Sequence, residues 1–336
     1  MFEVVNPGIM TTIQDLGRPG YRSIGIPLSG AADAFSLKVG NLLVGNNLGE
    51  AGLEILLYGL QLRALRRMII SVTGADLGIT LNEEKIPMWR TLEIESGDMI
   101  SVPSVKTSAL KGCRAYLTVA GGIDVPVMLG SKSTCLPGNF GGFKGRALKK
   151  DDRIEVGNSM LPLSELRNRK FSEIKRPNFD DKWEIRVILG PHDHLFTEES
   201  IRMFFNQTWR VSYKAARFGV RYIGPKFNYK PRPFHQVKRD PKGDPSNIPS
   251  QGVPLGAIEI AGGEEPIAIG VDGPSSTGYT MIAIIISADV WKIGQSKPGD
   301  LTSFKRVEID EAYQMLIDSE ELITKDNILL IDGIDK

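Results

Sequence analysis

Residues 11–21 collect hydroxyl, amide, carboxylate and guanidinium side chains in one segment punctuated by glycine and proline. Its candidate site residues are Thr12, Gln14, Asp15 and Arg18. A loop of this composition presents polar groups from a rigid base, as binding and catalytic loops do. The same residues also suit a tight turn in which Asp15 accepts backbone N–H groups and pairs with Arg18, so both interpretations stay open.

Residues 25–33 follow this stretch and lead into a segment with helical spacing at residues 32–44. Ser29 or Asp33 could cap that helix, which would be a structural role. A helix N-terminus that follows a glycine turn can also hold an anion or a carboxylate. We therefore keep Ser29 as a candidate substrate-binding residue.

A second polar stretch, residues 271–279, follows an apolar run and offers one carboxylate, three hydroxyls and a phenol. An amide or ureido group needs donors for its carbonyl oxygen and acceptors for its N–H groups, and such a loop supplies both. The candidates here are Asp272, Ser275, Ser276 and Tyr279. A strand-to-strand turn held by Ser and Thr is the alternative.

Three further polar residues stand near these stretches or after apolar runs. Asp76 follows the apolar residues 68–72 and is either a turn former or a site group. Arg217 could clamp a carboxylate or a bicarbonate-derived oxygen through two hydrogen bonds, and Asn247 could bind an amide face. For both, a surface ion pair or a loop-fixing hydrogen bond is the alternative.

His192 and His194 flank Asp193 and could begin a metal site, but no third His or Cys lies nearby. A turn that enters a helix at residue 198 explains the run more simply, so we predict no metal site. The sequence lacks a Walker phosphate loop, a Gly-x-Ser-x-Gly elbow and a biotin-acceptor pattern. We expect that this chain does not bind ATP alone and that any biotin is carried by another chain.

These residues must be positioned by a β-rich fold, because short β-branched runs alternate with 36 Gly and 20 Pro. Strands are predicted at residues 2–5, 53–57, 68–73, 91–94, 99–102, 114–119, 184–189, 221–223, 257–260, 267–271, 282–287 and 301–307. Helical spacing appears at residues 32–44, 198–205 and 309–322. The helices are expected to be few and peripheral.

The length of 336 residues predicts two domains. Residues 158–182 are polar and charged without an apolar period, which favours an exposed connection. We therefore predict an N-terminal domain at residues 1–160, carrying the first polar stretch, and a C-terminal domain at residues 184–336 that ends in a helix.

The charge balance, 41 Lys plus Arg against 40 Asp plus Glu, argues against nucleic acid as a partner. Only two cysteines are present, which favours reduced thiols. The first residues lack the pattern of a signal peptide, and no apolar run is long enough for a membrane span. We expect a cytoplasmic protein without a membrane partner.

Taken together, these stretches resemble the KipA family, which includes the third subunit of bacterial 5-oxoprolinase, allophanate hydrolase subunit 2 and part of the carboxyltransferase domain of urea carboxylase. The most specific run is Thr-Thr-Ile-Gln-Asp-Leu-Gly-Arg-Pro-Gly at residues 11–20. The resemblance continues at residues 27–33, 41–46, 53–54, 73–78, 116–123, 129–131 and 190–191, and from 217 to 289. It covers nearly the whole chain.

The resemblance implies two cyclophilin-like β-barrel domains with a few peripheral helices, and a partner subunit of the KipI type. In an oxoprolinase-type complex, with a LamB/YcsF-type subunit, ATP drives the opening of 5-oxoproline to glutamate. In a carboxyltransferase, a biotin carboxylase loads biotin, and the carboxyl group then passes to an amide nitrogen. A third possibility is a non-enzymatic regulatory binder of a KipI-like kinase inhibitor. The oxoprolinase-type activity is our first hypothesis.

The site that follows from this hypothesis has two sides. The carboxylates would orient or deprotonate the nitrogen of a small amide substrate, and the Arg and Ser groups would stabilise oxyanion charge. One side is expected to hold Gln14, Asp15, Arg18 and Asp76. The other is expected to hold Arg217, Asn247, Asp272, Ser275, Ser276 and Tyr279.

One departure from the oxoprolinase pattern bears on the substrate. Oxoprolinase-type members tend to have Asp-Arg-Gln-Thr-Thr-Gly-Gly-Tyr-Pro-Lys where this chain has residues 272–281, so Met281 replaces the lysine. Residues 216–226 and 245–248 are also more similar to the urea-carboxylase branch. The second half therefore favours carboxyl transfer more than the first half does.

Overall fold

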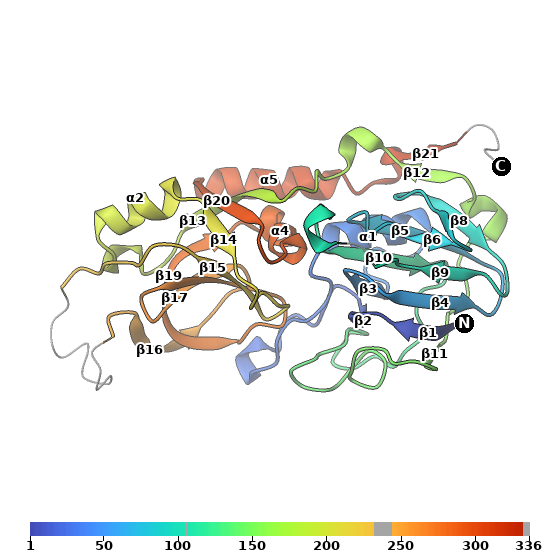
Figure 1. The fold of residues 1–336 in the computed structure, drawn as a ribbon, viewed down its shortest axis with the longest axis horizontal. Coiled ribbons are helices and arrows are strands. Elements are labelled where there is room, and N and C mark those ends of the chain that lie inside the picture. Colours follow the sequence, from blue (N-terminus) through green and yellow to red (C-terminus); the bar gives the residue numbers. More distant parts are fainter. Residues whose placement is uncertain (105, 232–243, 332–336) are drawn as a thin grey trace. The chain divides into compact units, whose positions relative to one another are not determined.

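A computed structural model describes residues 1–104, 106–231 and 244–331 (Figure 1). The chain divides into two compact units, and it passes between them more than once. Unit 1 consists of Met1–Arg18, Ser29–Phe179 and Glu320–Lys336, and unit 2 consists of Pro19–Leu28 and Asp180–Ser319. Residues 19–28 belong to unit 2, whereas the predicted range 1–160 placed them in the N-terminal domain. Residues 320–336 belong to unit 1, whereas the predicted range 184–336 placed them in the C-terminal domain.

Unit 1 contains two β-sheets around one apolar core. The six-stranded sheet has the order β11 (Arg153–Ile154), β1 (Phe2–Pro7), β4 (Leu60–Ala64), β9 (Met99–Ser101), β6 (Thr80–Leu81) and β7 (Glu84–Lys85). The five-stranded sheet has the order β2 (Met10–Gln14), β3 (Gly52–Leu56), β10 (Arg114–Val119), β5 (Met68–Gly74) and β8 (Thr91–Ile94). Both sheets supply fully buried aliphatic side chains to the core, such as Leu62 and Leu117.

Helix α1 (Ala34–Leu43) packs against β5 and β10 (Figure 1). It begins after Asp33, whose side chain accepts a hydrogen bond from the Ser36 amide at 2.9 Å. Of the two residues predicted to cap the helix, Asp33 is therefore the one that does so. Ser29 is available for a different role.

A small sheet of β12 (Arg169–Phe171) and β21 (Ile328–Leu330) completes unit 1. Phe171 is fully buried and contacts the rings of Phe35 and Trp89. The prediction that residues 158–182 form an exposed connection is therefore wrong in its middle. Single apolar residues among charged ones leave no period in the sequence, so their burial was not foreseen.

Replacing Phe171 by alanine should lower the free energy of unfolding by about 3–5 kcal/mol, because it leaves a cavity in this aromatic cluster. Ile174 is 88% exposed three residues later and serves as the control. Its alanine variant should change stability by no more than about 0.5 kcal/mol. Urea unfolding followed by fluorescence measures both, and equal effects would contradict the buried placement of residues 169–171.

Unit 2 is built on a closed barrel of seven strands. Their order is β13 (Lys182–Leu189), β20 (Leu301–Arg306), β14 (Trp209–Val211), β15 (Gly219–Ile223), β18 (Glu265–Ile269), β17 (Ala257–Ala261) and β19 (Ser276–Ile285). Pairing of β19 with β13 closes the ring, and β16 (Asn247–Gly252) adds to β19. The helices described in this unit are α2 (Glu198–Asn206), α4 (Val290–Gln295) and α5 (Ile309–Glu321).

The predicted fold class, mainly β with two barrel domains and a few helices, is confirmed in its β content, its few helices and the closed barrel of unit 2, while unit 1 consists of further sheets. Two local predictions need correction. Thr12 and Gln14 lie in strand β2 and not in a loop, and β19 begins at Ser276 instead of residue 282. Both strand segments carry hydroxyl and amide side chains, so they lack the apolar alternation by which strands are recognised. Among the described residues, no helix is long and apolar enough to cross a membrane.

Candidate functional site

The carboxylate of Asp15, directly after β2, is 7% exposed and holds two segments together. Its Oδ1 accepts from the Ser131 hydroxyl and the Gly17 amide, both at 2.7 Å. Its Oδ2 accepts from the Lys132 amide at 2.6 Å, and the Ser133 hydroxyl donates to Oδ1 as well. Four donors from protein groups make Asp15 a positioning residue rather than a base open to substrate.

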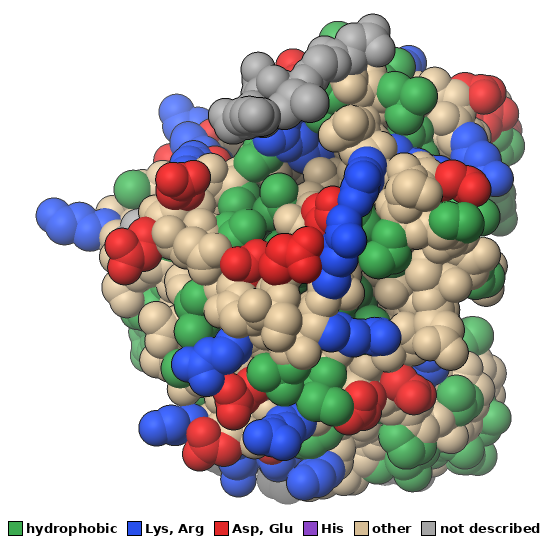
Figure 2. Space-filling view, turned by 90° about the vertical axis from the view of Figure 1, so that its right-hand side faces the viewer, with side chains coloured by type: hydrophobic (Ala, Val, Ile, Leu, Met, Phe, Trp, Pro, Cys, Tyr) green, Lys and Arg blue, Asp and Glu red, His purple; other side chains and the backbone are tan. Residues whose placement is uncertain are grey.

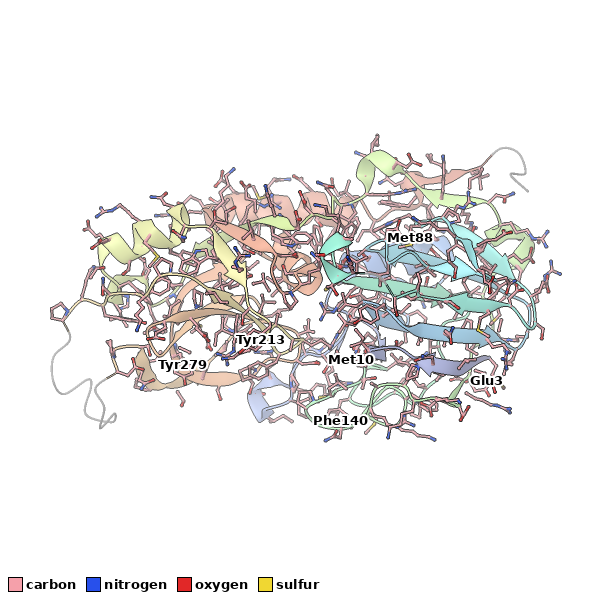
Figure 3. All side chains as sticks on the ribbon, viewed as in Figure 1. Glu3, Met10, Met88, Phe140, Tyr213 and Tyr279 are labelled. Carbon is pink, nitrogen blue, oxygen red and sulfur yellow. The ribbon has the colours of Figure 1, made fainter. Side chains whose placement is uncertain are left out.

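Arg18 is fully buried and contacts the same segment as Asp15. Its guanidinium donates to the Ser133 carbonyl and lies 4.8 Å above the ring of Phe140. Phe140 stands on the long loop between β10 and β11 (Figure 3). The sequence predicted Asp15 and Arg18 but missed Ser131 and Ser133, although residues 129–131 carry part of the family resemblance.

Gln14 and Ser29 each bury a polar atom for which the described residues offer no hydrogen-bond partner. The Gln14 amide nitrogen donates to the Thr12 hydroxyl at 2.9 Å, while its Oε1 has no donor. Ser29 adopts a left-handed backbone conformation, with φ of 54°, and its hydroxyl has no partner either. Buried polar atoms of this kind are uncommon in native proteins, and a place for a ligand is one reason for them.

The segments that carry these two atoms are neighbours, because the Ala31 amide donates to the Asp15 carbonyl at 2.8 Å. Gly30 allows the close approach, since a Cβ there would lie 2.7 Å from the Gly17 nitrogen. Gln14 Oε1 can accept from the N–H of an amide or ureido group, and the Ser29 hydroxyl can donate to its carbonyl. We call Gln14, Asp15, Arg18 and Ser29 the β2 cluster.

Glu54 and Tyr116 hold the segment that follows Ser29 through hydrogen bonds, and we predicted no role for them from the sequence. Glu54 accepts from the Ala32 amide at 2.9 Å and from the Tyr116 hydroxyl at 2.7 Å. Burial raises the pKa of Tyr116 well above its ordinary value, and the neighbouring Glu54 and Asp33 add to this rise. Tyr116 therefore stays protonated and acts as a hydrogen-bond donor. Both residues lie in stretches of the family resemblance.

Asp76 does not join the β2 cluster, and the prediction that it does is wrong. Strands β2 and β5 run antiparallel, with β3 and β10 between them. The C-terminal ends of β2 and β5 therefore point in opposite directions along the sheet. Asp15 follows one end and Asp76 the other. The Asp76 side chain is 50% exposed and pairs with Lys85 at 2.8 Å. A sequence cannot show this, because it does not give the strand order.

In unit 2, Arg217 and Asp272 form a buried ion pair in which each side chain is 3% exposed. The Arg217 Nε donates to Asp272 Oδ2 at 2.7 Å, and its Nη2 donates to Oδ1 at 3.2 Å. The two-point contact expected for a substrate carboxylate is thus made by Asp272. The structure brings these two predicted residues together, in a role different from the expected one.

Asn247, Ser276 and Tyr279 lie along the β16–β19 pair, where Asn247 faces Tyr279 in register. Tyr279 is 37% exposed and Ser276 is exposed (Figure 3). Ser275, in the turn before β19, accepts from the Val253 amide through its carbonyl. These four predicted residues therefore form one strip at the edge of the barrel.

Glu259 is an unpredicted carboxyl group close to that strip. It lies on β17 between Ile267 and Met281 on the neighbouring strands and is 3% exposed. Burial raises its pKa to about 7, although a hydrogen bond with Thr277 acts in the opposite direction. Its Oε1 has no partner among the described residues. In the sequence, Glu259 could have been recognised as a lone acid inside the predicted apolar strand at residues 257–260.

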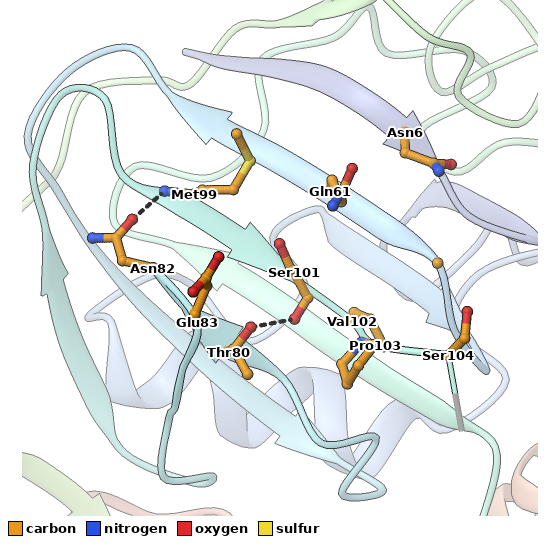
Figure 4. Close-up of a pocket in the computed structure, with 11 residues that line it drawn as sticks. Asn6, Gln61, Thr80, Asn82, Glu83, Met99, Ser101, Val102, Pro103 and Ser104 are labelled. Carbon is orange, nitrogen blue, oxygen red and sulfur yellow. Dashed lines mark hydrogen bonds between the residues drawn. The ribbon is translucent and has the colours of Figure 1, made fainter. Parts of the chain in front are cut away.

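A polar cavity of about 630 Å³ in unit 1 contains none of the predicted site residues (Figure 4). Two of its lining side chains are hydrogen-bonded to the backbone of strand β9. Asn82 accepts from the Met99 amide at 2.9 Å, and Thr80 donates to the Ser101 carbonyl. We assign this cavity no role in the chemistry.

The chain belongs to the family described as carboxyltransferase domain, subdomain A and B, whose model it matches over residues 24–306. It is 38% identical to urea amidolyase of Saccharomyces cerevisiae, with 96% of this chain and 17% of that protein covered. It is 31% identical to a 5-oxoprolinase subunit of Escherichia coli, with 95% and 96% covered. The chain thus spans only a small part of the urea amidolyases that it matches.

Among solved structures, the urea carboxylase of Kluyveromyces lactis superposes with a TM-score of 0.86 at 37% identity, covering 99% of this chain and 30% of that one. The urea amidolyase of K. lactis gives 0.88 at 38% identity and covers 98% and 20%. The relatives are parts of enzymes, either as subunits or as portions of larger chains.

Proposed function

We propose that this chain is the carboxyltransferase component of a biotin-dependent enzyme that carboxylates urea or a closely related amide. The observation that carries the proposal is the unpartnered pair in the β2 cluster, Gln14 Oε1 and the Ser29 hydroxyl. Together they match the N–H and carbonyl groups of a ureido unit. Identities of 37–38% to urea amidolyases, against 27–31% to 5-oxoprolinase subunits, support urea over 5-oxoproline.

Biotin also contains a ureido group, so biotin and urea are alternative occupants of these two atoms, and separate titrations decide which of them Gln14 and Ser29 bind. Carried by another chain and loaded by a biotin carboxylase, biotin would supply the carboxyl group. In the transfer, one C–N bond to the donor breaks, one C–N bond to the amide nitrogen forms, and a proton moves from the amide nitrogen to the donor nitrogen. ATP would be consumed in loading and not by this chain.

The residues of this chain would then bind and orient the ureido group and transfer that proton. Gln14 and Ser29 orient the ureido group, and their segments are joined by the hydrogen bond from the Ala31 amide to the Asp15 carbonyl. In unit 2, taken by itself, Glu259 is a separate candidate for proton transfer, because a carboxyl group with a pKa near 7 exchanges protons readily at neutral pH. These assignments replace the predicted catalytic roles of Asp76 and Asp272.

Gln14→Leu tests the ureido assignment through binding. Titration of free biotin, and separately of urea, into the purified chain should show saturable heat with the unmodified protein. The variant should bind at least about tenfold more weakly, the loss expected when a buried hydrogen bond is removed. Gln61→Leu, at an exposed glutamine of the same unit, is the matched control and should bind normally. Equal binding by both variants would contradict the assignment.

A second candidate function is a subunit of an ATP-dependent 5-oxoprolinase that acts with KipI-like and LamB/YcsF-type partners. It is favoured by one observation, the match to the 5-oxoprolinase subunit of E. coli along 96% of that protein's length. Binding of 5-oxoproline, without binding of biotin or urea, would select this candidate.

A further inference from the structure

Unit 1 contains a second cavity, of about 830 Å³, whose lining is strongly basic. It includes none of the residues of the β2 cluster. By contrast, the face of the molecule drawn in Figure 2 mixes basic and acidic side chains, in keeping with a net charge of +1. The basic side chains that line the cavity are those of Lys85, Arg90, Lys111, Lys170 and Arg176.

Two acidic side chains also line this cavity, and each has a basic neighbour. Asp76 pairs with Lys85 at 2.8 Å, and Glu173 lies 3.8 Å from Arg176. The acids are therefore matched by two of the basic groups. Arg90 and Lys170 leave the cavity with an excess of positive charge.

Arg90 and Lys170 are the most unusual members of this lining. They face each other in an antiparallel β-bridge, which places their side chains on the same side of the backbone. Both are half-buried, and within the described part of the chain neither makes an ion pair or a side-chain hydrogen bond. Like charges directly opposite each other destabilise a sheet, so this arrangement costs free energy unless an anion lies between them.

The rest of the cavity suits a small molecule. Its apolar walls include Met88, Pro177 and Phe179, and Met88 is labelled in Figure 3. A volume of about 830 Å³ lies within the usual range of about 300–1,000 Å³ for ligand cavities. An arginine guanidinium also matches the oxygens of phosphate and carboxylate groups in geometry.

We propose that this cavity binds a small, multiply charged anion that carries phosphate or several carboxylate groups, with Arg90 and Lys170 as its main ligands. The site is separate from the β2 cluster and does not depend on the proposed function. Phosphate and polycarboxylate share the required chemistry, and the choice between them is made by experiment.

Calorimetric titration of the full chain with pyrophosphate and with citrate tests the proposal. We expect saturable binding of at least one of them, and at least tenfold weaker binding by Arg90→Gln and by Lys170→Gln. Lys149→Gln removes one exposed charge of unit 1 outside the cavity and should leave binding unchanged. Tighter binding of pyrophosphate or of citrate identifies the class of ligand.

A thermal melt without ligand gives a second readout, because removing one of two facing cations relieves repulsion. Each cavity variant should melt at or above the temperature of the unmodified chain, which also shows that it is folded. Absence of binding for both anions would overturn the proposal. So would an equal loss of binding in Lys149→Gln, since that would mean attraction to overall charge.

Discussion

Replacing Asp272 by alanine should lower the free energy of unfolding by about 3–5 kcal/mol, because it removes the buried carboxylate that accepts two hydrogen bonds from the Arg217 guanidinium. Chemical unfolding followed by circular dichroism measures the change. Asp76→Ala removes an exposed partner of Lys85 and is the control, with an expected change of no more than about 1 kcal/mol.

The double replacement Arg217→Met with Asp272→Leu separates structure from function. Removing both charges together should recover most of the lost stability, since apolar side chains of similar volume often replace a buried ion pair without cost. If the pair only holds the fold, activity returns with stability. If the double variant is stable and inactive, the pair also acts in the reaction, and our assignment of Asp272 to structure alone is wrong.

Glu259→Gln should stabilise the protein at alkaline pH and leave it unchanged in acid. The folded state holds the pKa of Glu259 at about 7, above its ordinary value near 4.5. The folded protein therefore binds the proton more tightly than the unfolded chain, and stability is lost as pH rises from about 4.5 to about 7. The variant lacks this loss, so its advantage should grow to at most about 3 kcal/mol at pH 8 and vanish near pH 4.

Unfolding midpoints measured from pH 4 to pH 8 check this dependence. Glu265→Gln, at a more exposed acid of the adjacent strand paired with Arg221, is the control and should show a much weaker trend. The same Glu259 variant should lose catalytic rate if its carboxyl group handles the proton, although the fold is intact. If both variants showed the same pH dependence, the assignment of the titration to Glu259 would be wrong.

Strands with continuous apolar runs could be predicted from the sequence, whereas β4 and β14, in which apolar and polar residues alternate, were missed. Residues 68–73 and 114–119 match β5 and β10 because their buried side chains are largely aliphatic or β-branched. Strand β2 and the start of β19 were missed, since their buried or paired positions carry Thr, Gln and Ser. Composition alone assigns such segments to loops.

The candidate site was predicted in its parts but not in its arrangement. Asp15 and Arg18 both contact residues 131–133, as their prediction as a group would suggest. Asp76 follows a strand that runs in the opposite direction, so it lies at the other end of the strands. Arg217 and Asp272 were both singled out, but their mutual pairing depends on contacts between distant residues. Glu259 was missed although it is the one acid of the predicted strand at residues 257–260, because the sequence does not show that its side chain is buried.

Transfer of a labelled carboxyl group is the sharpest test of the proposed carboxyltransferase activity. The purified chain is incubated with biotin carboxylated with ¹³C, together with urea, and the carboxyl carbon is followed by NMR. We predict that the label moves to a urea nitrogen faster than the donor loses carbon dioxide alone, and that Gln14→Leu abolishes the transfer. No transfer to urea, together with ATP-dependent opening of 5-oxoproline by the chain and its partners, would contradict the account.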